Sequence, residues 1–151
     1  MSARSFLSGG NASDSARRVS LALRLAAGGT FAVFGIGKFV QHTTEVASFH
    51  DFGFSSAGAL VYAIGVVEIG GGVLLLAGLA TRVAALALAG NMVGAIATAG
   101  VKVGGPIHLG FAPALLIAML FIVWAGPDSR SLDARMLRSG GERAGPGTRA
   151  G

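Results

Sequence analysis

The sequence predicts an all-α integral membrane protein, a bundle of four spanning helices with both termini in the cytoplasm. Of its 151 residues, 52% are hydrophobic and only 13% are charged, about half the charged share of an ordinary soluble domain. Four long apolar runs divide the chain, and none shows the period-two alternation of a membrane β-barrel. Because one spanning helix takes about 20 apolar residues, a chain of this length holds four spans and short connections.

Three regions follow one another along the chain. We expect a flexible N-terminal tail over residues 1–18, a four-span membrane domain over residues 19–126, and a basic, mostly disordered C-terminal tail over residues 127–151. The tails are rich in small residues, or in arginine, glycine and proline, and they lack helical periodicity. The first apolar run contains Arg24 and has no small-residue cleavage site, so we do not expect a secretory signal.

The membrane domain divides into spans at about residues 19–40, 59–80, 83–101 and 109–125. The second and third spans are separated only by Thr81-Arg82, which predicts an antiparallel helical hairpin. Trp124 lies where an interfacial aromatic side chain is expected. Between the first two spans, a polar stretch predicts a short amphipathic element at the membrane surface with the apolar residues Val46, Phe49, Phe52 and Phe54.

The distribution of basic residues predicts the orientation. All ten arginines lie in the terminal regions, at the start of the first span or between the second and third spans, whereas the opposite side holds only Lys38 and Lys102. Because basic residues stay on the cytoplasmic side, both termini are expected there. The arginines form no patch with interleaved aromatic residues, so we expect the lipid bilayer as the partner and no nucleic acid.

Glu68 lies near the middle of a span, where an acidic side chain costs about 2.5–3.5 kcal/mol on insertion scales. The first span places Arg24 and Lys38 on one helical face, with glycines between them. We therefore expect an intramembrane polar cluster of Glu68, Lys38 and Arg24. This cluster can be a structural ion pair or a site for a ligand or proton. Alternatively, both bases extend to the membrane surfaces and a protonated Glu68 bonds a backbone carbonyl.

Small residues predict where the helices pack closely. Gly65 and Gly72 lie on the same helical face as Glu68, so another helix can approach there. In the third span, Gly90 and Gly94 form a small-residue face with Asn91 beside them, and the asparagine can hydrogen-bond across helices. We expect this second face to pack inside the bundle in preference to forming a dimer.

The side chains available for redox chemistry are limited. The chain has no cysteine, which excludes a disulfide framework, an iron–sulfur cluster and any other Cys-ligated cofactor. His42, His50 and His108 all fall on the side opposite the termini, but no pair has a recognised metal-ligand spacing. We therefore expect no metal site.

Four motifs in order resemble the DoxX family of small four-helix bacterial membrane proteins. They are Gly35, Gly37 and Lys38; Glu68 followed by Gly70, Gly71 and Gly72; the turn with Leu76, Gly78, Leu79, Thr81 and Arg82; and Gly126-Pro127 followed by Ser131-Leu132-Asp133. The resemblance implies a bacterial cytoplasmic-membrane location, and it marks Lys38, Glu68, Thr81, Arg82 and Arg24 as family-like polar positions. The family includes subunits of membrane oxidoreductases, among them a thiosulfate:quinone oxidoreductase, and members linked to oxidative-stress complexes.

The resemblance leads to two hypotheses. In the first, the protein is a small subunit of a redox-associated membrane complex with protein partners, and it holds quinone or another lipophilic ligand near Glu68. It has no self-contained catalytic motif, so it is at most a subunit of an oxidoreductase. In the second, it is a non-catalytic scaffold whose polar cluster is purely structural. An apolar cavity beside Glu68 favours the first hypothesis, and a glycine-packed interior favours the second. Transport ranks third, because four short helices form a pore only by oligomerising.

Overall fold

The computed structural model describes residues 13–127 and 131–136, and this part of the chain is helical without strands. The elements are α2 (Asp14–Val40), α3 (His42–Asp51), α4 (Ala57–Ala77), α5 (Thr81–Ala95), the π-helical turns η1 (Ile96–Gly100) and η2 (Ile107–Phe111), and α6 (Ala112–Ala125). Four helical stretches of the described residues are long and apolar enough to cross a membrane. The prediction of an all-α, four-span protein is therefore confirmed.

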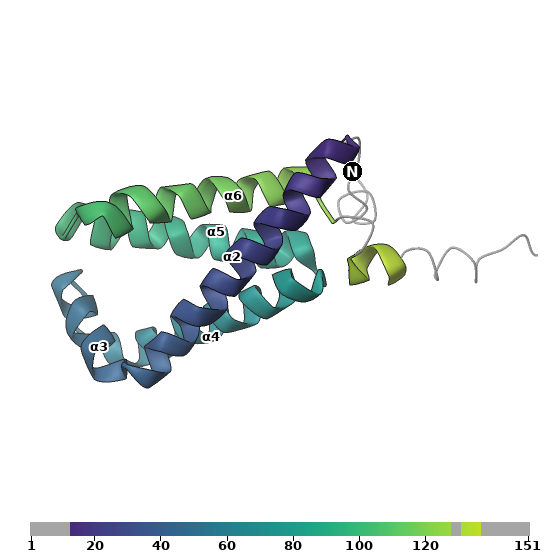
Figure 1. Ribbon diagram of the computed structural model, residues 1–151. Coiled ribbons are helices and arrows are strands. Elements are labelled where there is room, and N and C mark those ends of the chain that lie inside the picture. The colour runs from purple at the N-terminus through teal and green to yellow at the C-terminus, as the bar shows by residue number, and fades with distance from the viewer. Residues whose placement is uncertain (1–12, 128–130, 137–151) are drawn as a thin grey trace, which may run out of the picture.

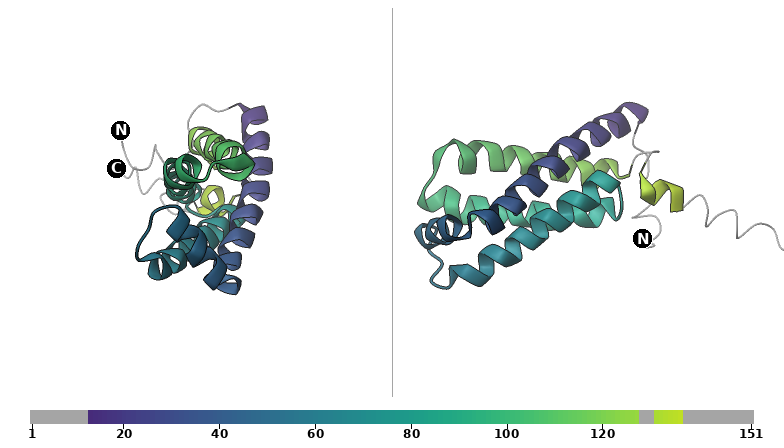
Figure 2. Two further views of the ribbon diagram at one scale, coloured as in Figure 1. Left: turned by 90° about the vertical axis from the view of Figure 1, so that its left-hand side faces the viewer. Right: turned by 60° about the horizontal axis from the view of Figure 1, so that its bottom comes forward.

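The four spans are arranged as two pairs of helices. Figures 1 and 2 show α2 lying along α4 and α5 lying along α6. The pairs meet at the end that carries the α4–α5 connection, where α2 begins and α6 ends. They diverge toward the opposite end, where α3 fills part of the space between them. We call these the terminal end and the α3 end of the bundle.

Each span begins earlier in the structure than the apolar runs indicate. The spanning helices cover Asp14–Val40, Ala57–Ala77, Thr81–Gly100 and Ile107–Ala125. In the first of them, Ser13 caps the helix by accepting a hydrogen bond of 3.2 Å from the backbone N–H of Ala16. Residues 14–18, expected in the flexible tail, are therefore helical. The apolar run marks the hydrocarbon region, whereas the capping residue sets the helix boundary.

Glycines bring the backbones of α2 and α4 into contact at two points. A Cβ atom added at Gly35 would lie 2.8 Å from the backbone nitrogen of Ile69 and 2.9 Å from the carbonyl oxygen of Gly65. A Cβ atom at Gly72 would lie 2.7 Å from the carbonyl oxygen of Gly28. No side chain fits at these positions, so the contacts set the register between the two helices.

The α4–α5 connection consists of Gly78, Leu79 and Ala80. Gly78 is left-handed (φ 67°), and the N–H groups of Gly78 and Leu79 donate to carbonyl groups in the last turn of α4, the pattern of a Schellman cap. Ala80 is also left-handed (φ 47°). Thr81 and Arg82, expected to form the connection, are instead the first two residues of α5.

Helix α5 receives its N-terminal cap from the C-terminal part of the chain. The two carboxylate oxygens of Asp133 accept hydrogen bonds from the N–H groups of Ala80 (2.7 Å) and Thr81 (2.9 Å). The N–H of Asp133 donates to the carbonyl of Gly78 (3.0 Å), and Ser131 is fully buried. Residues 131–136, expected within a mostly disordered tail, are therefore docked on the bundle. Since α5 has no capping side chain of its own, Asp133 satisfies N–H groups at its start that would otherwise lack an acceptor. The rest of that tail beyond Pro127 lies outside the described residues.

Asp133→Ala is expected to lower the free energy of unfolding by about 0.5–2 kcal/mol, because it removes the acceptor of two N–H groups at a helix start. Thermal unfolding in detergent measures the change. Asp51→Ala, which removes an exposed carboxylate at the α3 end, is the matched control and is expected to have little effect. Equal melting temperatures for the two variants would contradict the capping role.

Two separate apolar clusters stabilise the bundle. The larger one joins all four spans and includes the buried residues Phe31, Leu75, Leu88, Met119 and Ile122. The smaller one joins α3 to the start of α4 through Phe49, Ala57 and Val61, with further aromatic residues packed against it. The short amphipathic element predicted from the sequence thus packs on the protein itself. The space between the two clusters holds the candidate site.

Candidate functional site

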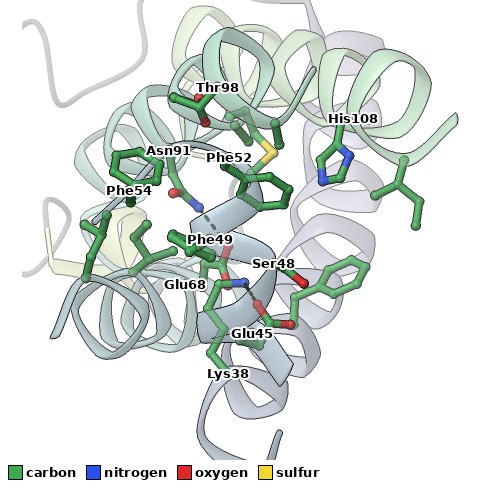
Figure 3. A pocket seen from close by; sticks show the side chains of 18 of the residues that line it. Lys38, Glu45, Ser48, Phe49, Phe52, Phe54, Glu68, Asn91, Thr98 and His108 are labelled. Atoms are coloured by element: carbon green, nitrogen blue, oxygen red, sulfur yellow. Dashed lines mark hydrogen bonds and ion pairs between the residues drawn. The ribbon is translucent and has the colours of Figure 1, made fainter. Parts of the chain in front are cut away.

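A cavity of about 520 Å³ lies between the diverging helix pairs and is bordered by α3 (Figure 3). Its walls come from α2, α3, α4, α5 and both π-helical turns, and they are mostly apolar. Four phenylalanines contribute to them: Phe34, Phe49, Phe52 and Phe54. Such a cavity falls within the range of about 300–1,000 Å³ that is typical of small-molecule sites.

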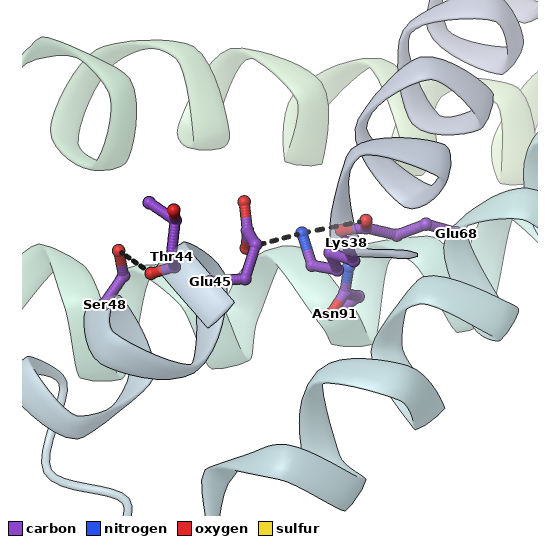
Figure 4. A network of polar contacts seen from close by, with 6 residues as sticks. All are labelled: Lys38, Thr44, Glu45, Ser48, Glu68 and Asn91. Atoms are coloured by element: carbon purple, nitrogen blue, oxygen red, sulfur yellow. Dashed lines mark hydrogen bonds and ion pairs between the residues drawn. The ribbon is translucent and has the colours of Figure 1, made fainter. Parts of the chain in front are cut away.

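One wall of the cavity is polar and is centred on Glu68. Figure 4 shows the network of polar contacts to which Glu68 belongs. Glu68 Oε2 lies 3.1 Å from Lys38 Nζ, and Glu68 Oε1 accepts a hydrogen bond of 2.8 Å from the side-chain amide of Asn91. Lys38 Nζ also lies 3.7 Å from a carboxylate oxygen of Glu45 on α3. The side chains of Glu68 and Lys38 are 6% and 12% exposed, whereas that of Glu45 is 33% exposed. One lysine therefore joins a buried carboxylate in the middle of a span to a more accessible one.

The direction of the helices explains why Glu68 pairs with Lys38. In an α-helix, each side chain leans toward the N-terminus of its helix. Helices α2 and α4 are antiparallel, so Lys38 leans from the α3 end toward the middle of the bundle while Glu68 leans toward the α3 end. The two side chains thus lean toward each other and close most of the distance along the bundle axis between the positions of Lys38 and Glu68.

Arg24 does not join this cluster. It is 4% exposed and lies at the terminal end, where its guanidinium group occupies the space beside Gly78. Gly78 follows Glu68 by ten residues, which is about 15 Å along a helix. Arg24 leans toward the start of α2 and away from Glu68. The expected cluster of three residues therefore consists of Lys38 and Glu68, together with Asn91 and Glu45.

Comparison with known proteins agrees with this fold. The sequence model of the DoxX family matches residues 19–101. The chain is 35% identical over 130 residues to the uncharacterized membrane protein Rv3486 of Mycobacterium tuberculosis, covering 77% of this chain and 80% of that relative. It is 32% identical over 114 residues to the Bacillus subtilis protein named "Putative oxidoreductase CatD", covering 76% of this chain and 84% of that relative.

The chain belongs to the DoxX family. No solved structure matches it with comparable significance. Two of the DoxX-like motifs, the turn with Thr81 and Arg82 and the segment from Ser131 to Asp133, meet at the terminal end through the hydrogen bonds of Asp133. Arg82 Nη2 also lies 3.4 Å from the carbonyl oxygen of Trp124. These DoxX-like positions hold the terminal end together and lie outside the cavity.

The glycines of α5 differ from the prediction. A Cβ atom added at Gly90 or Gly94 would meet no atom within 4 Å, and both residues line the cavity. They therefore do not pack against another helix of this chain, contrary to the expectation of packing inside the bundle. Gly65 and Gly72 do lie in the close contact between α2 and α4. The difference arises because α5 follows α6 away from α4 toward the α3 end, which leaves space beside the α5 glycines.

Several wall residues of this DoxX protein were not identified as site residues from the sequence. Glu45, Thr98 and His108 all line the cavity, and the last two lie in the π-helical turns η1 and η2. Such turns occur frequently at functional sites. His108 Nδ1 lies 3.1 Å from the carbonyl oxygen of Gly104, and its ring contacts Phe52. The sequence could have indicated Glu45, because it follows Lys38 by about two helical turns and lies in the next amphipathic segment.

The other two histidines lie elsewhere. His42 stacks on Tyr62 with ring centroids 3.8 Å apart, and His50 is exposed near the end of α3. The described residues contain no group of three or more histidine, aspartate or glutamate side chains that could hold a metal ion.

Proposed function

We propose that this DoxX-family protein is a small subunit of a redox-associated complex in the bacterial cytoplasmic membrane, and that its cavity holds a quinone or a similar lipophilic ligand. One observation carries the proposal: the cavity combines the polar wall of Lys38, Glu68 and Asn91 with otherwise mostly apolar and aromatic walls. The name of the Bacillus subtilis relative supports a redox role.

The polar wall offers the groups that a quinone carbonyl needs. Lys38 has three N–H donors, and two carboxylates lie near its ammonium group, so one donor can serve a ligand. Glu68 lies in contact with Lys38 and can hold or release a proton beside that carbonyl. A bound quinone would supply the electron-accepting ring. The chain has no cysteine, so a partner protein would deliver the electrons.

Glu68→Gln is expected to leave the protein at normal abundance in the membrane while removing its activity. The amide has the size of the carboxyl group and keeps an acceptor for Asn91, but it cannot exchange a proton. Complementation of a deletion strain under oxidative or sulfur stress measures the activity, with the protein level scored in the same membranes. Quinone extracted from protein purified in mild detergent is the second readout. Normal abundance with normal activity would eliminate Glu68 as a proton-handling residue.

The second candidate function is a non-catalytic scaffold. It is favoured by the glycine contacts between α2 and α4 and by the two partners of Glu68, which together lock these helices. If the protein is a scaffold, Glu68→Gln lowers abundance and activity together, because a charge-assisted contact is replaced by a neutral one. Wild-type protein then carries no quinone.

A further inference from the structure

Two glycines of α5, Gly90 and Gly94, line the cavity and are also exposed on the surface of the bundle. Gly90 and Gly94 are exposed, line the cavity and have no atom within 4 Å of an added Cβ position. They lie one turn apart on the same helical face. We call this surface the glycine notch. The main apolar cluster does not fill it, so the cavity wall is thin at this place.

The notch adjoins the polar wall directly. Asn91 follows Gly90 in the chain and lies on the same side of α5 as Gly94, and its amide donates to Glu68. A ligand whose ring contacts Glu68 and Lys38 is therefore already beside the notch. On α4, the apolar side chains of Leu60 and Ile64 also line the cavity.

Aromatic rings lie on the α2 side of the cavity. There the ring of Phe34 on α2 meets the ring of Phe111, the last residue of η2, with centroids 6.0 Å apart. Figure 3 shows Asn91 and Phe54 on one side of the cavity and His108 on the other. An extended group that leaves the polar wall thus meets bulky rings on the side of α2 and η2, and glycines on the side of α5.

We propose that the ligand is a membrane lipid with a hydrogen-bonding ring and a long apolar tail, and that the tail leaves the cavity between α4 and α5 across the glycine notch. This inference rests on the proposed quinone site. A cavity of about 520 Å³ holds a ring and the beginning of a tail, and a long isoprenoid tail must continue outside it. The notch provides an exit to the acyl chains of the bilayer that is lined by glycine and apolar side chains. Gly90 and Gly94 therefore determine specificity for tailed ligands.

The test compares two probes, a naphthoquinone with a long isoprenoid tail and the same ring without a tail. Gly94→Leu and the double variant Gly90→Leu/Gly94→Leu place side chains across the exit. We expect them to bind the tailed probe at least about tenfold more weakly and the tailless probe as the wild type does. The matched control is Gly70→Leu, because Gly70 is exposed, has no atom within 4 Å of its added Cβ and does not line the cavity.

The outcomes separate the inference from the proposed function. Binding of the tailed probe that is equal in the wild type and in both notch variants overturns the exit across the notch. Loss of both probes in the notch variants also overturns it, because the leucines then block the ring site. A wild-type protein that binds neither probe contradicts the proposed function itself. Gly94→Ala is the control for misfolding. Its methyl group meets no atom within 4 Å, so we expect this variant to bind both probes as the wild type does.

Discussion

Gly35→Ala is expected to lower the free energy of unfolding by about 1–3 kcal/mol, the usual cost of overpacking. The added methyl group would lie 2.8 Å from the backbone nitrogen of Ile69 and 2.9 Å from the carbonyl oxygen of Gly65. Backbone atoms cannot move aside as a flexible side chain can, so α2 and α4 must separate. Because Lys38 and Glu68 come from these two helices, their ion pair is expected to weaken as well. Thermal unfolding in detergent measures the loss.

Gly37→Ala is the matched control in the same helix. A Cβ atom at Gly37 meets no atom within 4 Å, and alanine is favoured over glycine in a helix by about 1 kcal/mol. The control is therefore expected to be as stable as the wild type or slightly more stable. If Gly35→Ala were also as stable as the wild type, the result would contradict the close contact between α2 and α4.

Lys38→Met is expected to destabilise the protein by about 3–5 kcal/mol, the cost of breaking a buried ion pair from one side. The change leaves the carboxylates of Glu68 and Glu45 without the cation between them. Glu68→Gln is expected to cost less, because Lys38 keeps Glu45 and the amide keeps an acceptor for Asn91. The double variant Lys38→Met/Glu68→Gln is expected to recover part of the loss, since no buried charge then lacks its partner.

A double-mutant cycle of melting temperatures in detergent measures the coupling between Lys38 and Glu68. Lys102→Met, which removes an exposed lysine at the α3 end, is the control and is expected to change stability little. Additive effects of the two substitutions at Lys38 and Glu68 would show that the two charges do not stabilise each other.

The spans were predictable because the solvent imposes them. Backbone groups in hydrocarbon must be satisfied within helices, so long apolar runs fix the number of helices almost regardless of detail. The register of α2 against α4 was partly predictable for a related reason, since close approach requires glycine and Gly35 and Gly65 lie at fixed positions in the chain. The cytoplasmic position of the termini remains a prediction from the arginines.

The site was less predictable, because it depends on the direction in which side chains lean and on where the helices leave a cavity between them. Helical spacing placed Arg24 and Lys38 on one face, but spacing alone does not show that one side chain leans toward Glu68 and the other away. The notch at Gly90 and Gly94 carries the same small-residue pattern as a packing face. Only the divergence of the helix pairs distinguishes the two.

The docking of Asp133 on the α4–α5 connection also constrains the order of assembly. Ala80 and Thr81 are synthesised before the last span. Asp133, which accepts hydrogen bonds from their N–H groups, follows them by 53 and 52 residues, after that span. The terminal end can therefore be completed only when the chain has inserted all four helices and has been released beyond Asp133. A chain that stalls or is cut before this residue keeps an open helix start at the terminal end. The short segment after the last span thus completes the capping of a helix that was synthesised two spans earlier.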